Sequence, residues 1–109
     1  MSAVSTLEAS LVELKARVTP EQAANLDLVV QFDISGDPGG TWHAVISGGT
    51  FRLSEGPAPA PNVTLRLASQ DWFDMVAGKK SSQMLFMTGR LKVKDDMMLA
   101  VRLASLLRI

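Results

Sequence analysis

Few residues of this 109-residue chain have the types and spacing that catalysis or metal binding needs. His43 is the single histidine and there is no cysteine, which excludes a disulfide, a thiolate nucleophile and a histidine pair for zinc. His43 is expected on the strand face opposite Trp42 and Ile46, without a nucleophile for acyl transfer. Asp95 and Asp96 could form an acid–base pair, but adjacent acids before an apolar helix are better explained as its N-cap and first turn. We therefore expect no catalytic residues, no metal site, no cofactor and no enzymatic activity.

The spacing of apolar residues predicts the elements that surround these positions. Leu7, Leu11 and Leu14 recur at helical spacing, and Thr19 followed by Pro20 marks the start of a second, short helix. Period-two alternation predicts strands, and capping residues predict further helices, with Ser69 before one and Ser81 or Ser82 before the next. The glycine-containing segments at 37–40 and 48–49 lack the ending of a phosphate-binding loop and are expected to be turns. The strands are expected at 26–35, 41–47, 50–54, 63–67 and 91–93, and the later helices at 70–77, 82–88 and 96–107.

This pattern predicts an α+β fold in one domain, residues 1–109. Each strand is apolar on one side and polar on the other, so helices should cover only one face of the sheet. We expect about five strands in a mostly antiparallel or mixed sheet, with four or five helices on that face. The length and the 47% hydrophobic content are typical of one globular core.

Charge is balanced over the whole chain but is unevenly distributed along it. The net charge of zero gives no support to nucleic-acid binding. Residues 1–78 contain four basic and nine acidic side chains, whereas residues 79–109 contain seven basic and two acidic ones, a net charge of +5. This basic end is either a solvated surface or a weak docking surface for an anionic membrane. The chain shows no signal peptide, no membrane-spanning stretch and no peroxisomal ending, so we expect a cytoplasmic protein.

The expected C-terminal helix has an apolar surface that is too broad for a single contact with a sheet. Arg102, Ser105 and Arg108 form one polar stripe, and most of the other positions are apolar. The helices at 70–77 and 82–88, a second subunit or a ligand must cover the remainder. Five of the six methionines lie between positions 75 and 98, and methionine adapts to ligands of different shapes, although it also fills gaps in an ordinary core.

Residues 86–103, which read FMTGRLKVKDDMMLAVRL, resemble the signature of the sterol carrier protein-2 family. That signature has a phenylalanine, a glycine, a basic residue, Leu-Lys-Ile, a Gly-Asp-Met turn and an apolar helix with a basic-Leu pair. Segments 63–65, 69–73 and 77–79 are similar to the family's preceding strand, capped helix and Gly-Lys stop. The resemblance covers residues 25–108, and it departs at Asp95, where the family usually has glycine.

The resemblance implies an apolar tunnel between sheet and helices that binds fatty acid, fatty acyl-CoA, phospholipid or sterol-like ligands. The chain would then be a small lipid carrier, working as a monomer or a homodimer. The alternative is a protein–protein interaction module, or an accessory subunit that presents a lipid-like or polyketide substrate to a partner enzyme. Lys79, Lys80 and Arg102 are the candidates for binding a ligand headgroup. The candidates for the apolar lining are Phe32, Trp42, Ile46, Phe51, Trp72, Val76, Met84, Met87, Met97, Val101 and Leu106.

Overall fold

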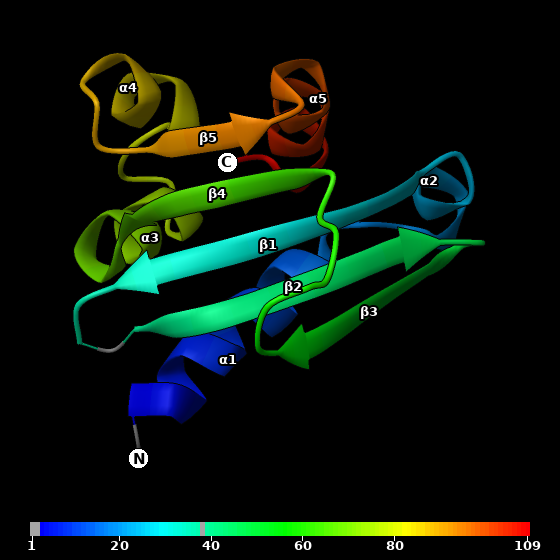
Figure 1. The fold of residues 1–109 in the computed structure, drawn as a ribbon, viewed down its shortest axis with the longest axis horizontal. Helices are drawn as coiled ribbons and strands as arrows, with labels where there is room; N and C mark the ends of the chain where they lie inside the picture. Colours follow the sequence, from blue (N-terminus) through cyan, green and yellow to red (C-terminus); the bar gives the residue numbers. More distant parts are fainter. Residues whose placement is uncertain (1–2, 38) are drawn as a thin grey trace.

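Five helices and five strands lie within residues 3–37 and 39–109, which the computed structural model describes (Figure 1). Pro38, in the turn predicted at 37–40, lies outside the described residues. The order of elements agrees with the sequence-based prediction. None of the helices in the described chain is long and apolar enough to cross a membrane. The elements are α1 (Ala3–Ala16), α2 (Pro20–Ala24), β1 (Asp27–Ser35), β2 (Gly40–Ser47), β3 (Thr50–Glu55), β4 (Val63–Ala68), α3 (Ser69–Val76), α4 (Ser82–Met87), β5 (Lys92–Asp95) and α5 (Met97–Leu107).

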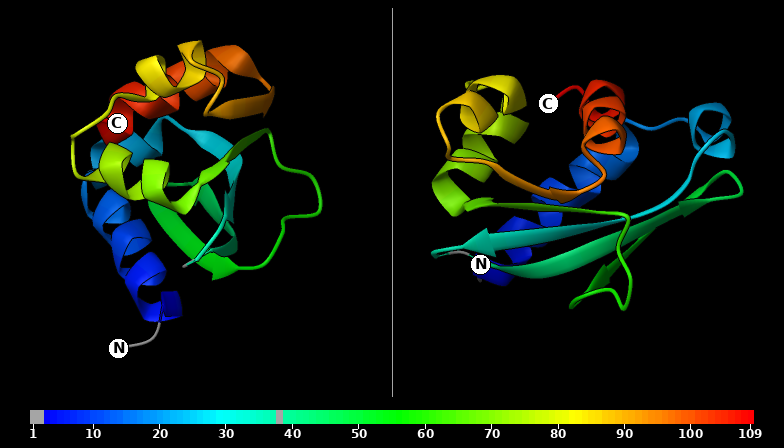
Figure 2. Two further views of the ribbon diagram at one scale, coloured as in Figure 1. Left: turned by 90° about the vertical axis from the view of Figure 1, so that its left-hand side faces the viewer. Right: turned by 45° about the horizontal axis from the view of Figure 1, so that its top comes forward.

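The strands form one mixed sheet in the order β3-β2-β1-β4-β5. All neighbouring pairs are antiparallel except β1 and β4, which run parallel with Phe32 opposite Leu65. The chain returns from β3 to β4 through residues 56–62, which bulge from the side of the sheet away from the helices (Figure 2). Two side chains fix this loop, because Gln31 Oε1 accepts a hydrogen bond from the Ala58 amide and Asn62 Oδ1 accepts one from the Val29 amide.

The helices cover one face of the sheet, as the alternation of apolar residues predicts (Figure 2). Leu7, Leu11 and Leu14 of α1 are each 1% exposed and belong to the same buried cluster as the inward side chains of β1 and β2. Phe32 of β1 meets Trp72 of α3 edge to face, with ring centroids 5.4 Å apart. This end of the face is therefore a closed core.

Two buried polar contacts tie the helices to one another. Trp72 Nε1 donates to Ser10 Oγ at 2.8 Å, and Ser10 Oγ donates to the Leu7 carbonyl, which joins α3 to α1. Arg17, just beyond α1, donates to the carbonyls of Leu107 and Val76 at 3.0 and 2.8 Å. These bonds satisfy carbonyls at the C-terminal ends of α5 and α3, where no intrahelical donor is available.

The helix starts agree with the predicted caps at three positions and differ at one. Thr19 forms a capping box with Gln22, Ser81 Oγ accepts from the Met84 amide, and Asp96 Oδ1 accepts from the Leu99 amide. The prediction for Ser69 was wrong, because α3 begins one residue earlier with Ala68 as its N-cap and no side-chain cap bond. An alternating strand runs directly into this helix, so no break in the sequence marks the boundary.

Candidate functional site

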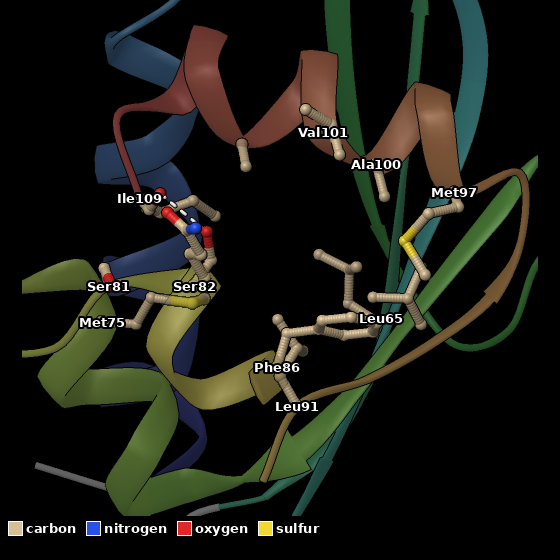
Figure 3. A pocket seen from close by; sticks show the side chains of 13 residues that line it. Leu65, Met75, Ser81, Ser82, Phe86, Leu91, Met97, Ala100, Val101 and Ile109 are labelled. Carbon is tan, nitrogen blue, oxygen red and sulfur yellow. Dashed lines mark hydrogen bonds between the residues drawn. The ribbon is translucent and has the colours of Figure 1, made fainter. Parts of the chain in front are cut away.

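A pocket of about 580 Å³ lies between α4 and α5, above β4 and β5 (Figure 3). Its walls come from β4, α3, α4, β5 and α5, and from Ile109. All but three of the lining side chains are apolar. They are Leu65, Met75, Ser81, Ser82, Gln83, Phe86, Leu91, Val93, Met97, Ala100, Val101, Ala104 and Ile109.

Two of the four α5 residues that line the pocket are small. Ala100 and Ala104 are four residues apart and line the pocket, whereas Leu103 and Leu107 are buried in the core at 2% and 0% exposure. At these two positions the helix therefore presents only methyl groups to the pocket, while two of its leucines fill the core. Two alanines on one face leave space that leucines would fill.

The α4 wall is a short helix with one buried anchor. Leu85 is 1% exposed and belongs to the core, while Phe86 lines the pocket and is 44% exposed. The Leu85 carbonyl accepts hydrogen bonds from the amides of Arg90 and Leu91, which turns the chain directly into β5. The position of Phe86 is thus set by Leu85 and by the turn that follows it.

A buried carboxylate on α3 holds both ends of the α4 segment. Asp71 is 4% exposed, and its two oxygens lie 3.3 Å from Lys80 Nζ and 3.2 Å from Arg90 Nε. Lys80 precedes α4 and Arg90 follows it, and Asp74 makes a second contact with Lys80 at 3.4 Å. These ion pairs satisfy the buried charge and fix the α4 wall to α3.

The polar residues of the pocket gather at the start of α4. Ser82 Oγ donates to the Ile109 carbonyl at 2.9 Å, and Ser81 and Gln83 lie beside it (Figure 3). No charged side chain lines this pocket within the described chain. Among those same residues no three His, Cys, Asp or Glu side chains gather as metal ligands would. The arrangement can hold an apolar chain, but it offers no acid–base pair and no activated nucleophile.

A second hollow, of about 790 Å³, lies on the other side of α5 and is more polar. Arg17, Arg102 and Arg108 line it, together with Leu106 and the residues around α2. Val101 borders both spaces. Val101 thus separates the apolar pocket from an arginine-lined hollow.

The predicted lining residues lie in four different places. Met97 and Val101 line the pocket, and Leu106 lines the second hollow. Met84 and Met87 lie on α4 outside the pocket, at 47% and 75% exposure. The other six are buried in the core and do not line the pocket: Phe32, Trp42, Ile46, Phe51, Trp72 and Val76.

The predicted headgroup residues are also separated. Arg102 lines the second hollow, Lys79 is exposed before α4, and Lys80 is paired with Asp71 and Asp74. Sequence reasoning missed most of the lining, including Leu65, Phe86, Leu91, Ala100 and Ala104. The feature that could have identified Ala100 and Ala104 is their four-residue spacing on a helix in which most other residues are large.

Asp95, where the resemblance departs, has a left-handed backbone with φ of 77°. Glycine adopts this conformation freely, and aspartate tolerates it better than most other residues. The turn into α5 thus keeps the backbone that a glycine would give.

Comparisons with known proteins agree with this geometry. The family model described as "SCP-2 sterol transfer family" matches residues 8–108. Hydroxysteroid dehydrogenase-like protein 2 of Rattus norvegicus is 32% identical over 95 residues, which cover 86% of this chain and 18% of that protein. The chain therefore spans about a fifth of this relative.

Two solved structures have a similar fold. The solution structure of palmitated SCP2L2 from Aedes aegypti has a TM-score of 0.79 at 21% identity, covering 100% of this chain and 96% of that one. Sterol carrier protein 2 from Yarrowia lipolytica, in its apo form, has a TM-score of 0.66 at 23% identity, covering 88% and 74%. The predicted α+β fold and the resemblance read from residues 86–103 are confirmed.

Proposed function

The chain belongs to the SCP-2 sterol transfer family, and we propose that it carries one apolar-chain lipid in the pocket between α4 and α5. Fatty acids, fatty acyl-CoA, phospholipids and sterol-like molecules are the candidate ligands. The pocket of about 580 Å³, lined almost entirely by apolar side chains, is the observation that carries this proposal. Its size falls within the range of small-molecule sites.

The mechanism is binding without chemical conversion. Each methylene group transferred from water into the pocket contributes about 0.8 kcal/mol, less the cost of ordering the chain and the ligand. Met75, Phe86 and Met97 supply adaptable contact surface, which suits ligands of different shapes. A similar fold is known in a palmitated state, which supports a fatty acid as the first ligand to test.

The ligand headgroup has two candidate positions, one inside the pocket and one in the second hollow. Ser81, Ser82 and Gln83 offer neutral hydrogen bonds at one end, and Arg102 lies across Val101 on the other side of α5. Arg102 forms no ion pair with the described residues, whereas Lys80 is paired with Asp71. We therefore favour Arg102 over Lys80 as the partner of a carboxylate or phosphate.

The direct test fills the pocket by placing a large side chain at one of the alanines that line it. Ala104→Trp places an indole where the ligand chain would lie, and it should lower the affinity for palmitate at least roughly tenfold, which is about 1.4 kcal/mol. Ala9→Trp adds the same side chain at an exposed position of α1, outside both hollows, and should leave affinity unchanged. Calorimetric titration of the delipidated protein measures both variants. Equal palmitate affinity in Ala104→Trp and wild type would place the ligand elsewhere.

The chain-length dependence of affinity is an independent test of the same pocket. A series of fatty acids should bind about fourfold more tightly for each added methylene until the apolar lining is filled, because about 0.8 kcal/mol corresponds to that factor. The plateau length reports the usable depth of the pocket. An affinity that does not depend on chain length would mean that the headgroup alone is bound.

A second candidate function is the presentation of a bound lipid-like or polyketide substrate to a partner enzyme. It is favoured by the relative named a dehydrogenase-like protein, of which this chain matches only 18%. Lipid-loaded and delipidated protein would be compared for their effect on the KM of an enzyme encoded beside this chain. A KM that is lowered only by loaded protein supports presentation. A cytoplasmic location and the choice between monomer and homodimer stay predictions.

A further inference from the structure

Exposed apolar side chains are concentrated on α4 and α5. Among residues whose side chains the structure describes, seven large hydrophobic residues are exposed, and six of them lie on these two helices. We call these six the mouth surface: Met84, Phe86, Met87, Met97, Met98 and Val101. The seventh, Val12, lies on α1 and is 50% exposed. The packing that buries other apolar residues is therefore missing around the pocket in particular.

Half of the mouth surface borders the pocket. Phe86, Met97 and Val101 line the pocket and yet are 44%, 41% and 64% exposed, so they form its rim (Figure 3). Met98, at 75% exposure, lies three residues before Val101 and four before Arg102, on one side of α5. The same helix side thus presents apolar and cationic groups together.

The segment that carries the mouth surface is strongly basic. Residues 79–109 have seven basic and two acidic side chains, a net charge of +5. Lys79, Lys92, Lys94, Arg102 and Arg108 are exposed, and none forms a salt bridge with a described residue. These five cations are therefore available to an anionic partner.

We propose that the mouth surface docks onto an anionic lipid bilayer, with its methionines in the interface and these cations against the headgroups. Charge complementarity favours this occupant, because exposed lysine and arginine side chains are attracted to the anionic headgroups of such a bilayer. A second copy is a poorer occupant, because a two-fold interface would set this basic surface against itself. The inference rests on the proposed carrier function, since docking would bring the pocket entrance to the membrane from which the lipid is taken.

The test uses one substitution in the mouth surface and a matched one on α1. Met98→Glu replaces an exposed apolar side chain that does not line the pocket, and its carboxylate suits the first turn of α5, so folding should be preserved. Val12→Glu makes the same kind of change at the other exposed position. Binding is measured by sedimentation with sucrose-loaded vesicles of phosphatidylcholine, with and without phosphatidylserine.

The expected result is specific to both the lipid and the position. Wild type should bind the vesicles that contain phosphatidylserine, and binding should weaken when the salt concentration rises from about 0.1 M to about 0.5 M. Met98→Glu should weaken this binding at least roughly tenfold, by removing an inserting side chain and adding repulsion. Val12→Glu should bind like wild type. Met98→Gln, which adds no charge, should lie between wild type and Met98→Glu.

Docking and carriage are separated by titrating the same variants with palmitate in the absence of vesicles. Normal palmitate binding, together with vesicle binding that Met98→Glu does not weaken, overturns the docking surface and leaves the carrier function intact. Loss of vesicle binding in Val12→Glu alone would assign the docking to α1 and overturn the proposal. Wild-type protein that binds vesicles but no palmitate would contradict the carrier function instead.

Discussion

The helix-covered face of the sheet is sealed at one end and open at the other. Toward β1 and β2, Phe32 is 1% exposed and packs edge to face on Trp72, among the leucines of α1. Toward β4 and β5, Phe86 is 44% exposed and lines a pocket of about 580 Å³. Two residues of the same type thus mark a sealed core and an open site.

The difference comes from the size of the side chains that the helices contribute. α1 adds three leucines to the buried core, at positions 7, 11 and 14. α5 adds only Ala100 and Ala104, four residues apart, to part of the pocket wall. The pocket therefore exists because smaller side chains leave space at one end of a continuous core.

Phe32→Ala should have the largest effect on stability. It removes a fully buried ring, leaves a cavity beside Trp72, and should lower the free energy of unfolding by about 3–5 kcal/mol. Urea denaturation followed by circular dichroism measures the loss. A loss below about 1 kcal/mol would mean that this end is loosely packed as well, and the contrast between the two ends would fail.

Asp71→Asn tests the link between the two ends and should have an intermediate effect. It removes the buried charge that holds Lys80 and Arg90, and should cost about 1–3 kcal/mol, with faster amide hydrogen exchange over residues 79–90. Asp33→Asn is the control, because its partner Arg66 is largely exposed and the pair should contribute less than about 1 kcal/mol. If exchange rises equally in both variants, Asp71 does not hold the α4 wall.

The sequence was sufficient for the elements and for the side of each element that is buried. Alternation in β1 and the capping residues Thr19, Ser81 and Asp96 are local signals, and the structure contains each of them. The start of α3 was misplaced by one residue, because Ser69 follows a strand without a break. Local periodicity determines boundaries only where the pattern changes abruptly.

The site could be predicted only in part, because periodicity does not say what lies opposite a buried face. Trp72 and Met97 are both apolar residues near a helix start, yet Trp72 meets Phe32 and Ser10 whereas Met97 faces the pocket. Which of the two residues reaches a pocket depends on how the helices pack against one another. Periodicity in the sequence does not determine that packing. The alanines at 100 and 104 were the more informative residues, since a site requires space and small side chains provide it.

Phe86→Ala sharpens the comparison, because it makes the same change as Phe32→Ala at the open end. Phe86 is already 44% exposed, and its removal widens an existing space instead of creating a sealed cavity. We expect the free energy of unfolding to fall by less than about 1 kcal/mol in the urea experiment, because little apolar surface loses its burial. Palmitate affinity should nevertheless fall roughly threefold to tenfold, since the ring is part of the pocket wall and a bound chain would lose that contact.

Phe32→Ala, at temperatures where it stays folded, should bind palmitate nearly as well as wild type. The opposite pattern, with affinity lost in Phe32→Ala and kept in Phe86→Ala, would move the binding site to the α1 side of the sheet.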